Sequence, residues 1–262
     1  MSDSMSPATF GPARSCDTPC DPWKFWATGA WTAAALAAWV AVQFLVFIGM
    51  LFYLGIGDDA PSGEVEKLAA HAVVISLIVT LSIPAEIGVV ALAIRFARCR
   101  FADYVALVWP SRHYLLAGIV FLVVLLPLAD IVTWMSGRSI VPPFVIEAYK
   151  TARDSGTLWL FTFALVVAAP LTEEIVFRGF MYRGLAASRA GVAGAIVIPS
   201  AIWAVMHVQY ENFFIIQIFL LGVIFGVLRW QSGSTWLTIV LHGIVNLSSL
   251  LQTVYFVEKA GQ

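Results

Sequence analysis

Residues 158–180 read LWLFTFALVVAAPLTEEIVFRGF and place Glu173, Glu174 and Arg178 inside a strongly apolar stretch. One acidic or basic side chain costs about 2.5–3.5 kcal/mol at the centre of a bilayer on insertion scales, so three of them together predict a function. Glu174 and Arg178 are four residues apart, so on a helix they share a face and should form an ion pair. Glu173 is rotated by about 100° from Glu174 and is left available as a base.

The composition predicts an integral membrane protein. Of 262 residues, 60% are hydrophobic and only 12% are charged, whereas about a quarter of the residues of a soluble domain are charged. A membrane span needs about 20 predominantly apolar residues. Seven apolar stretches are long enough or nearly so, and Pro170 interrupts the fourth, so that an eighth element is possible. We therefore expect an all-α, polytopic transmembrane bundle of seven or eight helices; the stretches are 27–57, 69–97, 114–134, 157–185, 192–208, 213–230 and 235–257.

The chain divides into a predicted flexible tail, residues 1–22, and a single transmembrane domain, residues 23–262, with a catalytic core at about 157–250. The tail is rich in Ser, Pro, Thr and Asp and lacks the basic start and apolar core of a cleavable signal. The absence of a targeting peptide, with many Ala and Val residues, favours a bacterial inner membrane.

Charge and cysteine content exclude other classes of protein. The net charge is -1 and no Lys/Arg-rich run occurs, so nucleic acid is not an expected partner. Cys16 and Cys20 match neither a redox nor a paired zinc pattern, and together with Cys99 they are expected to be unpaired thiols.

Two later segments carry further polar residues within apolar sequence. Ser200, Trp203 and His207 recur at helical spacing and are expected to share a stripe that faces a cavity. His242 and Asn246 are four residues apart, and both can direct hydrogen-bond donors to one point. Such a pair can serve as an oxyanion hole.

Three motifs in this order resemble the CAAX-protease and bacteriocin-processing family of intramembrane glutamic endopeptidases: EEIVFRG at 173–179, SAIWAVMH at 200–207 and HGIVN at 242–246. The resemblance implies a bundle of about eight transmembrane helices. It also implies that Glu173, assisted by His207, activates the attacking water.

By the same resemblance His242 and Asn246 would stabilise the oxyanion, while Glu174 and Arg178 would support the site. Family members commonly carry phenylalanine where this chain has Trp203, so Trp203 and Ser200 are candidates for the substrate groove. The expected partners are the lipid bilayer and a protein or peptide with a membrane-associated C-terminal region.

Two alternatives stay open. Glu173, His207 and His242 are a plausible three-ligand set for zinc, although no HExxH motif is present; the family resemblance instead implies no metal or other cofactor. A non-catalytic protein could instead use Glu86, Asp130 and Glu173 as a proton path, or bind peptides for immunity. No GxSxG elbow occurs and no cysteine lies near the histidines, so direct attack by water is preferred to an acyl-enzyme.

Overall fold

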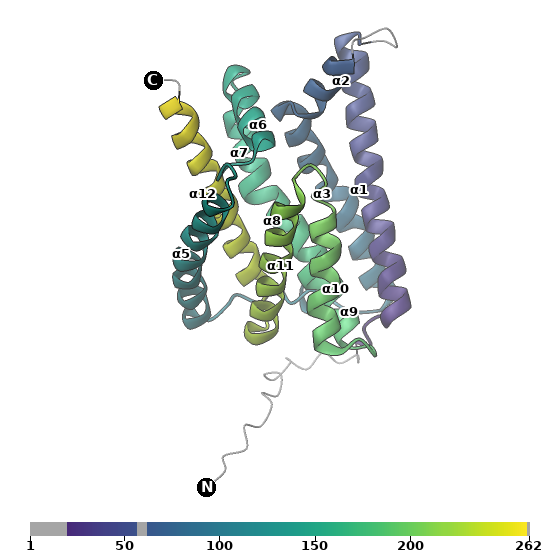
Figure 1. The fold of residues 1–262 in the computed structure, drawn as a ribbon. Coiled ribbons are helices and arrows are strands. Elements are labelled where there is room, and N and C mark those ends of the chain that lie inside the picture. Colours follow the sequence, from purple (N-terminus) through teal and green to yellow (C-terminus); the bar gives the residue numbers. More distant parts are fainter. Residues whose placement is uncertain (1–19, 57–61, 261–262) are drawn as a thin grey trace.

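The computed structural model describes residues 20–56 and 62–260, and in these ranges the regular secondary structure is helical, with no strands (Figure 1). The predicted tail therefore lies outside the described residues except for residues 20–22. The helices before the broken fourth stretch are α1 (Phe25–Leu54), α2 (Ser62–Ala69), α3 (Ala72–Phe96), α4 (Phe101–Tyr104), α5 (Arg112–Met135) and α6 (Pro143–Asp154).

The fourth stretch forms one continuous rod that changes its helical type along its length. Its parts are α7 (Leu158–Phe163), the π-helix η1 (Ala164–Ala168), α8 (Ala169–Glu174), the π-helix η2 (Ile175–Met181) and α9 (Tyr182–Ala186). Pro170 sits in the first turn of α8, directly after η1. Because a π-helix accommodates a local break in the hydrogen-bond ladder, the proline does not split the rod, and the possible eighth element does not form.

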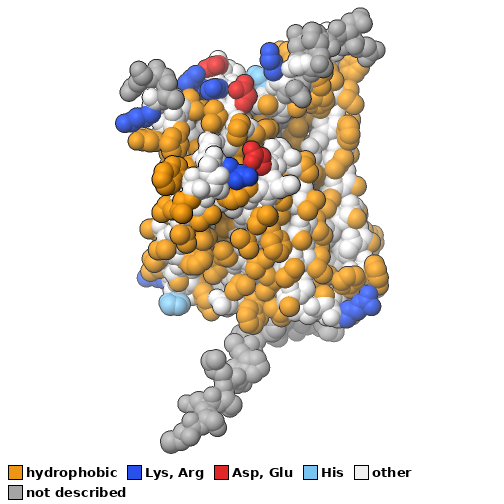
Figure 2. Space-filling model, in the orientation of Figure 1, with side chains coloured by type: hydrophobic (Ala, Val, Ile, Leu, Met, Phe, Trp, Pro, Cys, Tyr) orange, Lys and Arg blue, Asp and Glu red, His pale blue; other side chains and the backbone are white. Residues whose placement is uncertain are grey.

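The remaining helices are α10 (Gly191–Val205), α11 (Asn212–Ser232) and α12 (Thr235–Ala260). Six helices of the described chain are long and apolar enough to cross a membrane, and α10 is a shorter apolar helix. The predicted polytopic helical bundle is thus confirmed, with six span-length helices and one shorter apolar helix among the described residues. Figure 2 shows hydrophobic side chains over most of one face, with charged side chains toward its upper end and lower corners.

α10 is a short helix. α10 has 15 residues, which corresponds to about 22 Å at 1.5 Å per residue, so it is shorter than the hydrocarbon core of about 30 Å. In Figure 1 the loop between α10 and α11 ends well below the upper ends of α1 and α3. The residues of this loop, 206–211, therefore lie closer to the middle of the bundle than an ordinary loop would.

Two glycines of α11 allow it to pack closely on α10. A Cβ atom on Gly226 would meet Cγ2 of Ile196 at 2.9 Å, and one on Gly222 would meet Cβ of Ser200 at 3.0 Å. The GxxxG pattern of α11 therefore acts between two helices of one chain.

The expectation of unpaired thiols is wrong for two of the three cysteines. Cys20, just before α1, forms a disulfide with Cys99, just after α3. The pairing follows from the fold, because α1 and α3 pack as antiparallel neighbours and the indole Nε1 of Trp23 donates to the carbonyl of Ala93 at 3.0 Å. Cys16 lies outside the described residues.

Replacing Gly226 with alanine should destabilise the bundle, because overpacking a tight contact costs typically about 1–3 kcal/mol. The measurement is the thermal unfolding midpoint of the purified protein in detergent. Gly49→Ala is the matched control, since a Cβ atom there would meet nothing within 4 Å. Equal midpoints for both variants would mean that Ile196 moves aside freely.

Candidate functional site

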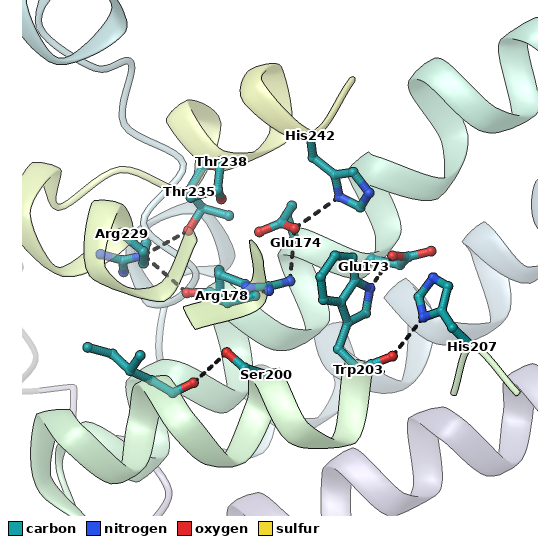
Figure 3. Close-up of polar contacts among 12 residues, drawn as sticks. Glu173, Glu174, Arg178, Ser200, Trp203, His207, Arg229, Thr235, Thr238 and His242 are labelled. Atoms are coloured by element: carbon teal, nitrogen blue, oxygen red, sulfur yellow. Dashed lines mark hydrogen bonds and ion pairs between the residues drawn. The ribbon is translucent and has the colours of Figure 1, made fainter. Parts of the chain in front are cut away.

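The predicted site residues come from three segments of the chain that meet inside the bundle. α8 supplies Glu173 and Glu174, while the end of α10 supplies Trp203 and the turn after it His207. α12 supplies His242. Figure 3 shows these side chains gathered around the indole of Trp203.

Glu174 is the most enclosed charge of the site. Its side chain is fully buried, and its Oε1 atom accepts hydrogen bonds from Nη1 of Arg178 at 2.9 Å and from Nδ1 of His242 at 3.0 Å. The ion pair expected from the spacing of Glu174 and Arg178 is therefore present. Since His242 belongs to α12, the same oxygen also joins the rod of the fourth stretch to the last helix.

Arg178 is held on two further sides. Its Nη2 atom donates to the carbonyl of Gly222 in α11 at 3.3 Å, and its guanidinium carbon lies 4.5 Å from the centre of the Trp203 ring. This carbonyl is available to Arg178 because Gly222 has no side chain to cover it: a Cβ atom there would come within 3.2 Å of Nη2. The arginine thus connects three segments at the centre of the bundle, which are its own helix, α10 and α11.

Glu173 points to the more open side of Trp203. It is half-buried, and its Oε2 atom accepts a hydrogen bond from the indole Nε1 of Trp203. Its other oxygen makes no hydrogen bond with the described residues. A phenylalanine at position 203 could not make this bond, so the tryptophan adds an orienting contact that the sequence alone did not reveal.

Both histidines use Nδ1 to fix their rings. Nδ1 of His207 lies 2.8 Å from the carbonyl of Trp203, and since a carbonyl only accepts, Nδ1 carries the proton. Nδ1 of His242 likewise faces the carboxylate of Glu174. The Nε2 atoms are left for other partners. The Trp203 ring is in edge contact with both imidazoles, with centroids 5.3 Å apart in each case.

Tyr210, in the loop after α10, contacts His207 through its ring and its backbone. The Tyr210 ring stacks on the His207 ring with centroids 6.1 Å apart, and the amide N–H of Tyr210 donates to the carbonyl of His207 at 3.0 Å. Burial raises the pKa of Tyr210 to about 12, so its phenol stays protonated at neutral pH.

Asn246 is anchored to η1. Its Nδ2 atom donates to the carbonyl of Leu165 at 2.8 Å. Because a primary amide carries two N–H donors, the second one is still available. Asn246 is half-buried and lies one turn beyond His242 on α12, as the spacing of these two residues predicts.

The prediction that Ser200 and Trp203 line a substrate groove does not fit this structure. Ser200 is fully buried and donates its hydroxyl to the carbonyl of Ile196 at 2.7 Å, while Trp203 is 2% exposed. Close packing of α11 against α10 covers Ser200. Both residues belong to the support of the site.

The zinc alternative has no geometric support in the described part of the chain. Among these residues no group of three or more His, Cys, Asp and Glu side chains could hold a metal ion. The indole of Trp203 lies in edge contact with both His207 and His242, which separates the two imidazoles.

The two other acids singled out in the sequence take different positions. Glu86 in α3 is buried. Asp130 in α5 accepts a hydrogen bond from Gln252, which lies ten residues beyond His242 on α12. This separation corresponds to about 15 Å along the helix, so Asp130 is not part of the cluster around Trp203.

Residues 155–248 match the family model described as Type II CAAX prenyl endopeptidase Rce1-like. The matched segment begins just before α7 and ends within α12, and it contains every site residue predicted from the three motifs. No curated protein and no solved structure matches the chain. The match confirms the family resemblance and, with the membrane helices, indicates a membrane protease of the CAAX type.

Replacing Glu174 with glutamine should lower the free energy of unfolding by about 3–5 kcal/mol, because Arg178 would keep a buried charge without its partner. In the double variant Glu174→Gln/Arg178→Met neither position of the pair carries a charge, so a large part of this loss should be recovered. Denaturant unfolding in detergent micelles measures both.

The control is Glu258→Gln, which removes an exposed partner of Arg153 and should change the stability by less than about 1 kcal/mol. A Glu174→Gln variant that unfolds like this control would show that the buried pair contributes little.

Proposed function

We propose that this membrane protein, whose residues 155–248 match the type II CAAX prenyl endopeptidase family, is an intramembrane glutamate-type endopeptidase. It cleaves peptide bonds of membrane-associated proteins or peptides near their C-terminus, by direct attack of water. The observation that carries the proposal is the arrangement around Trp203: Glu173 and His207 each keep a free acceptor, and His242 keeps a free Nε2 on the other edge of the indole. Asn246, one turn beyond His242 on α12, keeps a free N–H.

Glu173 is the base in this proposal. Trp203 holds one carboxylate oxygen, so the other is free to accept a proton from water. Nε2 of His207 carries a lone pair, because Nδ1 holds the ring proton. A water molecule that donates to both groups is oriented for attack, and general-base catalysis of this kind contributes typically about 10²–10⁴-fold.

His242 and Asn246 stabilise the negative charge that forms on the carbonyl oxygen, by donating hydrogen bonds to it. The second N–H of Asn246 is free to donate, and Nε2 of His242 donates when the ring is an imidazolium. A donor of this type is worth about 10²–10³-fold in kcat. Glu174, paired with Arg178, keeps the ring of His242 in place.

In this proposal the atoms and protons of the hydrolysis balance without a cofactor. The water oxygen bonds to the carbonyl carbon while Glu173 takes its proton, and the tetrahedral intermediate then expels the amine. The proton passes to the departing nitrogen, leaving a carboxylic acid and an amine. The turn after the short α10 supports the water supply, because it places His207 and polar backbone next to Trp203, which binds Glu173.

Glu173→Gln should lower the cleavage rate by at least about 10²-fold, since glutamine cannot accept the proton. The assay is cleavage of a membrane-peptide library by purified protein in detergent, with new termini identified by mass spectrometry. Glu147→Gln, which changes an exposed acid of α6, is the matched control and should cleave like the wild type.

A strong chelator should leave cleavage unchanged, because the proposed base is a carboxylate. Loss of cleavage on chelation would instead support a metal-dependent mechanism with Glu173, His207 and His242 as the metal ligands. Folded wild-type protein that cuts nothing in a broad library would favour a binding or transport function.

Trp203→Phe should reduce kcat/KM by about tenfold or more, because a hydrogen bond to a charged group contributes about 1.5–3 kcal/mol. The phenyl ring keeps the aromatic packing against His207 and His242. Trp109→Phe, at an exposed position, controls for the loss of an indole. Equal activity of Trp203→Phe and wild type would show that the hydrogen bond from the indole N–H to Glu173 does not contribute to catalysis.

A further inference from the structure

A second polar site lies between the C-terminal halves of α5 and α12. A cavity of about 380 Å³ opens there on the surface of the bundle, lined in part by Asp130, Ile140, Ser248 and Gln252. Ligand pockets generally measure about 300–1,000 Å³, so this cavity has room for a side chain and not for a whole folded segment.

Asp130 is a carboxylate without a cation in this cavity. Its Oδ2 atom accepts one hydrogen bond, from Nε2 of Gln252 at 2.6 Å. All ion pairs between described residues involve other acids. A carboxylate can accept about four hydrogen bonds, and an acid within a membrane span is by default a functional residue with a partner to be named.

The mouth of the cavity is apolar and faces outward. Leu251, Tyr255 and Phe256 are 59%, 57% and 41% exposed, respectively. Nζ of Lys259 lies 5.4 Å from the centre of the Tyr255 ring, so the chain's own nearby lysine sits over that ring. The lining therefore combines apolar surface for an alkyl chain with one acid, which complements a lysine or arginine side chain.

The distance of Asp130 from the proposed catalytic groups determines how many substrate residues lie between the scissile bond and this cavity. Gln252 lies ten residues beyond His242 and six beyond Asn246 on α12, or about 15 and 9 Å along the helix axis. At 100° per residue, Gln252 is about 80° from His242 around that axis. An extended peptide advances about 3.3–3.6 Å per residue, so these distances correspond to about three to five residues of substrate.

We propose that the cavity at Asp130 is a specificity subsite that binds a lysine or arginine of the substrate, about three to five residues from the scissile bond. The carboxylate of Asp130 receives the cationic group, and Gln252 holds that carboxylate in place. This subsite rests on the proposed peptidase function and adds a substrate class to it.

The test uses one peptide that the wild type cleaves in proteoliposomes, with lysine, glutamine or glutamate placed in turn at the second to seventh positions on each side of the scissile bond. The quantity measured is the ratio of kcat/KM for the lysine peptide to that for the glutamine peptide. The wild type should prefer lysine by about tenfold at one of the third to fifth positions. Asp130→Asn should bring that ratio close to one, and Asp130→Lys should make the glutamate peptide the preferred one.

Asp103→Asn is the matched control, because Asp103 is an exposed acid in α4. It should keep the lysine preference of the wild type. The reversal expected for Asp130→Lys is a gain of cleavage, which misfolding cannot produce.

A wild type that cleaves all three peptides equally at every position would overturn the subsite while leaving the peptidase function intact. An Asp130→Lys variant that still prefers lysine would do the same. A wild type that cleaves no peptide at all would instead overturn the peptidase function, and the subsite with it.

Discussion

One oxygen atom, Oε1 of Glu174, organises the centre of this protein. It accepts from Arg178 on its own rod and from His242 on α12, while Arg178 reaches the backbone of α11. A buried carboxylate is stable only when it is paired and hydrogen-bonded, so these segments have to meet in one relative position. The aromatic ring of Trp203 closes the arrangement and separates the buried scaffold from the half-buried Glu173 and His207.

Much of this arrangement could be predicted from the sequence where the cause is local. The i, i+4 spacing predicts the pairing of Glu174 with Arg178, because helix geometry alone brings the two side chains together. The lengths of the apolar stretches predict the membrane helices, and the glycine spacing in α11 predicts close helix packing. The three motifs predict which segments supply the site.

Contacts between distant segments could not be predicted in the same way. The disulfide of Cys20 with Cys99 depends on α1 and α3 being neighbours, and the burial of Ser200 depends on how α11 lies on α10. The hydrogen bond from Trp203 to Glu173 requires the indole to turn toward α8, which a helical stripe does not specify. The two π-helices also follow no pattern of apolar residues, although Pro170 marked the place of the first.

The short α10 has a consequence for the lipid around the protein. Val197 and Val205 on α10 are exposed apolar side chains, suited to contact lipid, yet α10 has only 15 residues against the 30 of α1. Such a hydrophobic mismatch is relieved by thinning the bilayer beside the shorter element. The acyl chains next to α10 should therefore be compressed relative to those beside α1. A polypeptide that approaches from that side crosses less hydrocarbon before its backbone reaches water.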